Sequence, residues 1–278
     1  MTINKQPVSS VQDLYHSSGE IVRGSFGSDE ASAMAYYAPY VNFVSDLIPI
    51  SVLGHLSLLD VGCGNGWSTL ALGKAGYQSL GIDLNAGAFE APQSERVELR
   101  YGSALDLQFE DNRFDVVTIY SCLEHVPDPT KALAEMCRVC KKGGHVVIVG
   151  PNLLSPTTGF SFLFNSQIRK TIPFVFRKGQ ARYPYGNTKV GIALIAALRS
   201  FQLAAKLIRR GPHFLKREPD TCPPFHADND SCYLCNPTDL IKYFQCLGWQ
   251  VVRKGKQGRF PGAYLLAGGT WVAAKKPQ

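Results

Sequence analysis

The sequence predicts an α/β fold in which a doubly wound, mostly parallel sheet carries helices on both faces. Three observations lead to this prediction. Short apolar segments recur along the chain with helical stretches between them. A glycine-rich turn directly follows the first apolar segment, and an acidic residue closes the second. The apolar runs have the composition of strands that are covered on both faces.

The first fifty residues, 1–50, are expected to form a helical cap. A helix is predicted over 31–47, with Ser28 or Asp29 available as its N-cap. Three tyrosines lie on this helix, namely Tyr36, Tyr37 and Tyr40. They either close over a bound ligand or pack on the core, and packing on the core is the simpler expectation.

Seven strands are expected, at 58–61, 78–82, 97–100, 115–120, 145–150, 249–254 and 264–274. The helix before the fifth strand should begin at Asp128 and Pro129 and stop at Gly143–Gly144. A further helix over 237–247 leads into the last two strands, which should form an antiparallel edge. The core sheet is therefore divided between residues 51–150 and 236–278.

The glycine turn predicts a pocket for a ribose-bearing nucleotide. Glycine allows sharp turns and close approach of a ligand to the backbone. The glycines are spaced G-x-G-x-G, whereas a nicotinamide fingerprint is G-x-G-x-x-G, and Trp67 occupies the position of its third glycine. Asp60 adds a carboxylate where a pyrophosphate would be repelled and a cationic ligand favoured. Asp83, at the end of the second strand, is placed to accept hydrogen bonds from ribose hydroxyls.

The turn resembles motif I, D-x-G-x-G-x-G, of the class I S-adenosylmethionine-dependent methyltransferases. Asp60, Gly62, Gly64 and Gly66 match that motif, and Asp83 matches the acid that holds the ribose. The resemblance implies a Rossmann-like seven-stranded sheet and S-adenosyl-L-methionine as cofactor. The cofactor-binding residues it implies are Asp60, Gly62, Cys63, Gly64, Gly66, Asp83, Leu84, Ser103, Ala104, Tyr120 and Ser121.

Two later segments extend the resemblance. Residues 102–109, GSALDLQF, are similar to the family's G-D-A-x-x-L-P-F, and residues 133–152 resemble its fourth helix, glycine turn and fifth strand. Ser103 replaces an acid that in the family contacts the adenine amino group, and Gln108 replaces a proline. Ser103 can still accept one hydrogen bond, and backbone groups near Ala104 are expected to share adenine recognition.

His125 is the candidate catalytic base, in the segment Glu124–His125–Val126. It follows the fourth strand, at the carboxyl edge where open α/β sheets bind ligands. The ordinary pKa of histidine lies near neutrality, which suits a base for a hydroxyl acceptor. The alternative is that His125 only shapes the loop. Glu124 is expected to be structural or near the cofactor.

Between the fifth strand and the late helix lies an insertion, 151–235, which is expected to build the acceptor lid or a membrane contact. The net charge of the chain is +7, yet residues 151–217 contain twelve Lys or Arg and no Asp or Glu. Residues 160–176 are rich in phenylalanine, and residues 191–210 predict an amphipathic helix. One interpretation is a lid helix with its apolar stripe on the core and its basic face in solvent. The others are an anionic membrane surface bound through 160–217, or nucleic acid, which the lack of an RNA-binding module disfavours.

The chain has eight cysteines without a disulfide framework, which is typical of a reducing compartment. Cys222, His226, Cys232 and Cys235 have ligand chemistry for zinc but an unusual spacing, so no metal is expected. Neither a secretory h-region nor an apolar run long enough to span a membrane is present in the sequence. The expected location is the cytoplasm, with a peripheral position on the inner face of a membrane as an extension.

The resemblance implies methyl transfer to a small-molecule, glycan or lipid-linked acceptor, as in quinone and surface-polysaccharide pathways, with oxygen as the favoured methylated atom. Two other functions stay open at this point. One is a nicotinamide-dependent oxidoreductase, which Asp60 and Trp67 disfavour. The other is a membrane-associated protein that binds the cofactor without turnover. The oligomeric state and the identity of the acceptor do not follow from the sequence.

Overall fold

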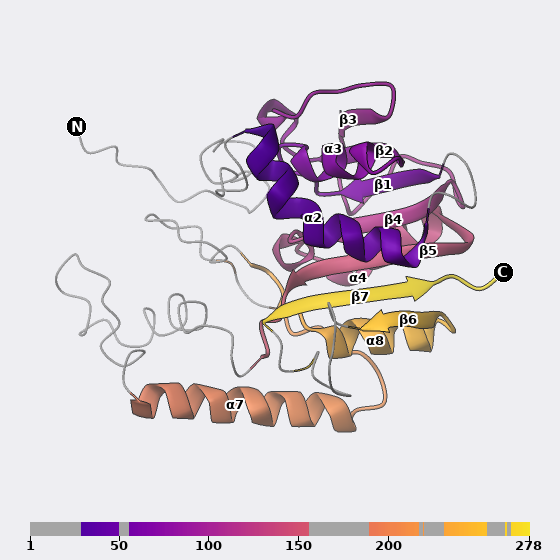
Figure 1. The fold of residues 1–278 in the computed structure, drawn as a ribbon. Coiled ribbons are helices and arrows are strands. Elements are labelled where there is room, and N and C mark those ends of the chain that lie inside the picture. Colours follow the sequence, from indigo (N-terminus) through magenta and orange to yellow (C-terminus); the bar gives the residue numbers. More distant parts are fainter. Residues whose placement is uncertain are drawn as a thin grey trace, which may run out of the picture.

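The computed structural model describes residues 29–49, 56–155, 189–216, 219, 231–254, 265 and 268–278. They form a seven-stranded sheet with the order β3-β2-β1-β4-β5-β7-β6 (Figure 1). The strands are β1 Ser57–Val61, β2 Gln78–Asp83, β3 Val97–Tyr101, β4 Phe114–Tyr120, β5 Cys140–Pro151, β6 Gln250–Lys254 and β7 Gly269–Lys275. Each of the seven predicted strands is present, but β5 begins at Cys140 instead of 145 and β7 begins at Gly269 instead of 264.

The sheet is mostly parallel, as predicted. β1 pairs in parallel with β2 and β4, and the parallel pairing continues to β3 on one side and β5 on the other. β7 is antiparallel to both β5 and the edge strand β6. Strand order reverses between β1 and β4, because the chain moves outward through β2 and β3 before it returns. In open α/β sheets a ligand binds at such a switch point, outside the carboxyl ends of the strands.

Helix α2, Glu30–Leu47, lies with α3, Trp67–Lys74, on one face of the sheet (Figure 1). The side chain of Asp29 accepts a hydrogen bond from Ser32 N at 2.9 Å, which confirms the predicted N-cap. Tyr37 and Tyr40 are buried in the core of this face, whereas Tyr36 is 40% exposed. Two of the three tyrosines therefore pack on the core, and the helix is a fixed layer of the fold.

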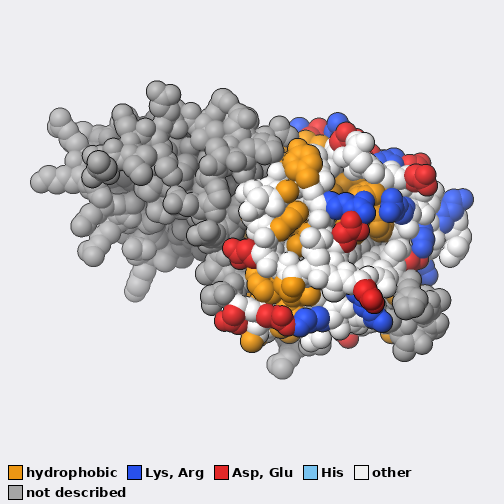
Figure 2. Space-filling model, turned by 90° about the horizontal axis from the view of Figure 1, so that it is seen from above, with side chains coloured by type: hydrophobic (Ala, Val, Ile, Leu, Met, Phe, Trp, Pro, Cys, Tyr) orange, Lys and Arg blue, Asp and Glu red, His pale blue; other side chains and the backbone are white. Residues whose placement is uncertain are grey.

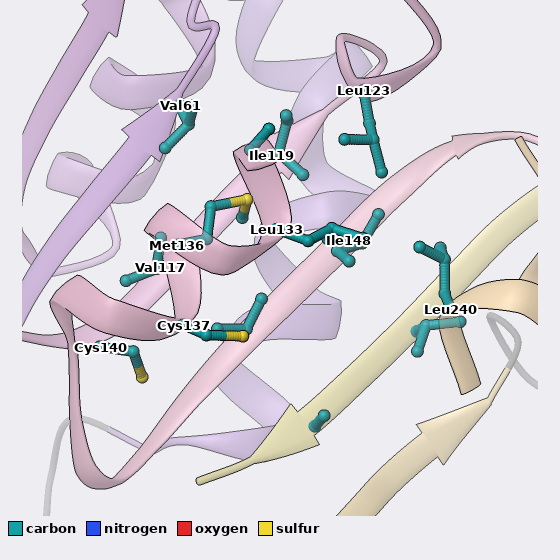
Figure 3. Packing of buried hydrophobic residues seen from close by; sticks show 14 of the residues in the cluster. Val61, Val117, Ile119, Leu123, Leu133, Met136, Cys137, Cys140, Ile148 and Leu240 are labelled. Atoms are coloured by element: carbon teal, nitrogen blue, oxygen red, sulfur yellow. The ribbon is translucent and has the colours of Figure 1, made fainter. Parts of the chain in front are cut away.

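The opposite face carries α4, Pro129–Val139, and α8, Pro237–Cys246. Leu133 and Met136 of α4 and Leu240 of α8 are fully buried against apolar side chains of the central strands. Figure 3 shows these side chains interdigitating between the helices and the sheet. Pro129 stands at the start of α4 after the capping Asp128, as expected.

The prediction that α4 stops at Gly143–Gly144 is wrong. The helix ends at Val139, and β5 begins at Cys140. A Cβ on Gly144 would lie 2.8 Å from the carbonyl oxygen of Asp115, so this residue must be glycine to let β5 approach β4 where the pairing shifts register. The glycines therefore serve strand pairing, a role that short-range sequence patterns do not distinguish from a helix stop.

Helix α7, Lys189–Ile208, confirms the helix that was predicted within the insertion. Its orientation is opposite to that of the lid interpretation, in which the apolar stripe packs on the core. Leu203 and Lys206 are buried, whereas Leu198, Phe201 and Ile208 are 49%, 73% and 84% exposed. The described part of the apolar stripe thus faces away from the core. The aromatic stretch 160–176 lies outside the described residues.

The reversal of α7 has a physical cause. Lys206 forms a buried ion pair with Asp239 of α8, and its ammonium also donates to the carbonyl oxygen of His213. Lys242 caps the other side by donating to the carbonyl oxygens of Lys206 and Arg209. Burial lowers the pKa of Lys206, and the ion pair with Asp239 opposes that shift. Within the part of the chain that the structure describes, no helix is both long and apolar enough to cross a membrane.

Candidate active site

The glycine turn lies at the switch point, at the carboxyl ends of the parallel strands. Val61, the last residue of β1, is in register with Ile82 of β2 and Ile119 of β4. The N–H groups of Gly62 and Cys63 both donate to the carbonyl oxygen of Ile82, at 2.8 and 3.0 Å. The turn is therefore tied to β2 and lies where the strand order reverses.

Two of the glycines cannot be replaced without a clash. Gly62 has φ +68°, and a Cβ there would lie 2.2 Å from the Sγ atom of Cys122, in the loop after β4. Gly66 has φ +91° and caps α3 directly against Leu99. Because glycine has no side chain and tolerates positive φ angles, the turn can pack closely between β1 and the loop after β4. The contact with Cys122 was not predicted, because no local pattern links residues so far apart in sequence.

Asp60 has a different position from the one expected. Its carboxylate is fully buried and accepts hydrogen bonds from Ser68 at 2.6 Å, Thr69 at 3.0 Å and Thr118 at 3.0 Å. Tyr40 of α2 donates to the same carboxylate at 3.3 Å. Burial raises the pKa of Asp60, and the four hydroxyl groups oppose that shift.

This geometry corrects the expectation that Asp60 offers its charge to a cationic ligand. The carboxylate has no exposed surface and its hydroxyl donors enclose it, so it joins β1, α3, β4 and α2 beneath the turn. Such a network holds the turn rigid, because the loss of any partner would leave a buried polar group unsatisfied.

Asp83 has the position expected for a ribose acceptor. Its two carboxylate oxygens accept hydrogen bonds from Gly64 N and from Asn85 N, each at 2.9 Å. The carboxylate is partly exposed at the end of β2, next to Leu84, which is also half-buried. Burial raises the pKa of Asp83, and these backbone N–H groups oppose the rise. Each oxygen retains a lone pair, so two hydroxyl groups could still donate to it.

The turn after β3 contains Ser103 and Ala104, which are both half-buried. Ser103 Oγ accepts a hydrogen bond from Leu105 N at 3.2 Å, and its backbone pairs with Asp106. A Cβ on the preceding Gly102 would lie 3.1 Å from Ile82, so this turn packs closely on β2. Ser103 therefore stabilises its own turn and keeps one lone pair that can accept a further bond.

Tyr120 and Ser121 end β4 beside the glycine turn. Ser121 has φ +46°, an uncommon angle for a residue with a side chain, and its N–H donates to Val149 O at 2.7 Å. The ring of Tyr120 contacts the rings of Tyr37 and Tyr40, with centroids 5.3 and 4.8 Å apart. Its hydroxyl lies 3.4 Å from that of Tyr36.

This group of four tyrosines was not predicted as a unit. The three on α2 were assigned to the cap, and Tyr120 to the cofactor site, 84 residues from Tyr36. Burial raises the pKa of Tyr120, and the hydrogen bond with Tyr36 raises it further, so its phenol stays protonated in the neutral range. The tyrosines give the site an aromatic wall with a phenol donor at its rim.

His125 closes the short helix η3, Leu123–His125, after β4. Its side chain is 17% exposed, and Nε2 lies 3.8 Å from Oε1 of Glu124, which is 1% exposed. The backbone oxygen of Glu124 accepts hydrogen bonds from Cys232 N at 2.7 Å and Tyr233 N at 3.1 Å. Residues 231–236, at the end of the insertion, therefore support the loop that carries the histidine. The backbone of Glu124 thus has a structural role, which is one of the two roles expected for this residue.

Most of the described cysteines are small core side chains, whereas Cys122 is half-buried and Cys246 is exposed. Cys232 and Cys235 are buried at 5% and 0% exposure, and burial raises the pKa of the Cys235 thiol well above its ordinary value. Burial also raises the pKa of Cys137 and of Cys140 to about 12. Cys222 and His226 lie outside the described residues. Among the residues that are described, no three side chains form a group suited to a metal ion.

The site fits the cofactor that the sequence suggested. Asp83 keeps carboxylate lone pairs that ribose hydroxyls could donate to, Ser103 Oγ keeps one position that can accept a hydrogen bond, and the glycine turn lets a ligand approach the backbone. Together with the strand order, these features define a class I S-adenosylmethionine-dependent methyltransferase fold.

Comparison with known proteins finds the same class over one segment of the chain. Residues 59–148 match the family described as a methyltransferase domain. This segment holds the glycine turn and Asp83, so the part of the chain that forms the site is similar to methyltransferase domains. The match favours methyl transfer over the nicotinamide-dependent oxidoreductase alternative.

Among curated relatives, a demethylmenaquinone methyltransferase of Renibacterium salmoninarum is 33% identical over 127 residues, which are 45% of this chain and 53% of that protein. One of Staphylococcus aureus is 46% identical over 100 residues, which are 33% of this chain and 42% of that protein. The matched part of the chain thus spans about half the length of these relatives. An S-adenosylmethionine-dependent methyltransferase structure from Mesorhizobium loti shares the fold, with a TM-score of 0.51 at 12% identity, over 89% of this chain and 100% of that one.

Proposed function

We propose that this chain transfers a methyl group from S-adenosylmethionine to a small-molecule acceptor, and that the acceptor is a lipid-linked, quinone-like compound. The observation that carries the proposal is the glycine turn with Asp83 at the switch point, inside the segment that matches a methyltransferase domain. The printed names of the curated relatives support a quinone acceptor. A glycan or another small molecule remains an outcome of the test below.

Different residues serve cofactor binding and proton transfer. The sulfonium of the cofactor supplies an electrophilic methyl group. Asp83 accepts hydrogen bonds from the ribose and so fixes the cofactor relative to the end of β2. The aromatic wall formed by Tyr36, Tyr37, Tyr40 and Tyr120 excludes water beside the turn. Because the leaving group is good, positioning supplies much of the catalysis.

His125 is the proposed base for a hydroxyl acceptor. Its imidazole is partly exposed at the carboxyl edge of the sheet and takes the proton of a hydroxyl group on the reduced, hydroquinone form of the acceptor as that oxygen receives the methyl group. The carboxylate of Glu124, 3.8 Å away, stabilises the imidazolium that forms, while the segment 231–236 holds the loop in place. This arrangement favours oxygen as the methylated atom.

The test is transfer of a labelled methyl group by the full chain into fractionated lipid, glycan and RNA pools, followed by mass spectrometry of the labelled product. The proposal expects label in the lipid fraction and a methoxy group in the product. Label on carbon would correct the methylated atom, and label in glycan would correct the acceptor. Tight cofactor binding without transfer into any pool would favour the non-catalytic alternative instead.

A variant tests the base directly. His125→Ala should lower kcat by about 100-fold, the usual contribution of general base catalysis, with an unchanged affinity for the cofactor. The matched control is His213→Ala, because His213 is exposed and its contacts to α7 and α8 use only backbone atoms. Unchanged turnover of His125→Ala on the identified acceptor would leave the histidine with a shaping role only.

A further inference from the structure

The outward face of α7 consists of apolar side chains throughout its described part. An α-helix completes a turn every ~3.6 residues, so residues 197, 201, 204 and 208 share one face, flanked by 198 and 205. All six are exposed: Ala197, Leu198, Phe201, Ala204, Ala205 and Ile208. The two buried residues of this part, Leu203 and Lys206, lie on the opposite side. The helix is therefore inverted relative to an ordinary surface helix, whose apolar side faces the core.

The inversion is fixed by strong contacts. The ion pair of Lys206 with Asp239, at 4% and 1% side-chain exposure, holds one side of α7 against α8. Lys242 donates to the last carbonyl groups of α7, which satisfies the helix end. Rotating the helix to bury Phe201 would expose a paired charge and break these bonds. The apolar face must therefore remain outward in this fold.

The charge around this face indicates its occupant. Arg209 and Arg210 follow α7 directly and are exposed. They belong to the segment 151–217, which carries twelve Lys or Arg and no acidic residue. The face of the molecule near β3 is different, because Figure 2 shows charges of both signs interspersed on it. In the described part, exposed arginines therefore lie at the end of an apolar helix face with no acidic residue between 189 and 216. This combination is complementary to a surface that is both anionic and apolar beneath.

We propose that α7 is a membrane-docking helix, with its outward apolar face inserted among lipids and with Arg209 and Arg210 on anionic headgroups. A second copy of the chain fits this face less well, because a symmetric contact would bring two acid-free basic segments together. Figure 1 shows α7 at the periphery of the molecule, beyond α8, where a flat surface can reach it. The inference concerns binding to the membrane alone and holds for any acceptor that the site methylates.

The test is co-sedimentation of the full chain with vesicles of phosphatidylcholine alone or of phosphatidylcholine mixed with phosphatidylglycerol. Binding should require phosphatidylglycerol and should weaken as salt is raised. The double variant Phe201→Ser with Ile208→Ser should lose binding by about tenfold or more, since both exposed side chains would otherwise leave water. Absence of binding to mixed vesicles at low salt would overturn the proposal.

A pair of single variants separates this face from general surface hydrophobicity. Leu198 on α7 and Leu247 after α8 are 49% and 48% exposed. Leu198→Ser should weaken vesicle binding, whereas Leu247→Ser should not. Equal effects would contradict docking through α7. Light scattering tests whether the face binds a second copy of the chain instead. Membrane docking would be refuted if the parent chain forms a dimer, does not bind vesicles, and loses the dimer in the Phe201→Ser, Ile208→Ser double variant.

Discussion

Replacing Asp83 by asparagine should weaken cofactor binding by about two orders of magnitude. The carboxylate accepts Gly64 N on one oxygen and Asn85 N on the other, so both oxygens must be acceptors. An asparagine amide presents an NH₂ group to one of those N–H donors in either orientation. The variant therefore loses one backbone contact and, on the ligand side, at least one charge-assisted bond to a ribose hydroxyl.

The magnitude follows from the hydrogen bonds involved. Hydrogen bonds to a charged group contribute about 1.5–3 kcal/mol each. Loss of one such bond to the ribose, with partial loss of the second, corresponds to about 3 kcal/mol, or about 100-fold in the dissociation constant. The unsatisfied N–H group should also lower the free energy of unfolding by about 1–3 kcal/mol. Binding must therefore be measured well below the unfolding transition of the variant.

Isothermal titration calorimetry with S-adenosylhomocysteine, which cannot be turned over, measures this effect. Glu95→Gln is the control, since Glu95 is exposed at the opposite end of β3. Burial raises the pKa of Asp83 above its ordinary 3.8. As the pH is lowered, the affinity for S-adenosylhomocysteine should therefore begin to fall at a higher pH than it would for an aspartate with an ordinary pKa. The Asp83→Asn variant should lack this pH dependence. Unaltered affinity in a folded Asp83→Asn variant would refute the assignment of the ribose to this residue.

Two further predictions concern the frame of the site. Gly62→Ala places a Cβ 2.2 Å from Cys122 Sγ at φ +68°, so it should destabilise the protein by about 2–4 kcal/mol in denaturant unfolding. Gly211→Ala, with no atom within 4 Å, should change stability little, and equal effects would disprove the steric argument. Hydrogen bonds from Arg138 lower the pKa of Glu135 in the folded protein below its ordinary 4.5. The stability that Glu135 contributes is therefore present above pH 4.5 and is lost as the pH falls through the pKa of the folded state. The difference in unfolding free energy between the parent chain and Glu135→Gln should therefore shrink in acid; a constant difference would exclude this linkage.

Much of the fold and part of the site follow from local patterns in the sequence. The strands are read from apolar runs, and the caps at Asp29 and Asp128 from short signals that involve only neighbouring residues. The glycine turn and Asp83 are separated by one helix and one strand, and β1 and β2 pair in parallel. Parallel pairing brings their carboxyl ends together, so the sequence alone places the two features at one site.

Other features depend on contacts between distant segments. Asp60 looked available to a ligand until Ser68, Thr118 and Tyr40 were seen to enclose it. Gly143–Gly144 looked like a helix stop, yet the close approach of β4 decides its role. A local pattern cannot show which neighbour will occupy the space around a side chain, because that neighbour comes from elsewhere in the chain.

The sequence by itself determined the class of fold, the places of the strands along the chain and the meeting of the glycine turn with Asp83 at the ends of β1 and β2, because these depend on hydrophobic periodicity and on turns between consecutive elements. Only the tertiary structure decided which side of α7 faces outward. Helical periodicity defines an apolar stripe but not its partner, and the buried pair of Lys206 with Asp239 outweighs the usual tendency of such a stripe to face the core. The outward face of this helix is therefore a property of the packed chain.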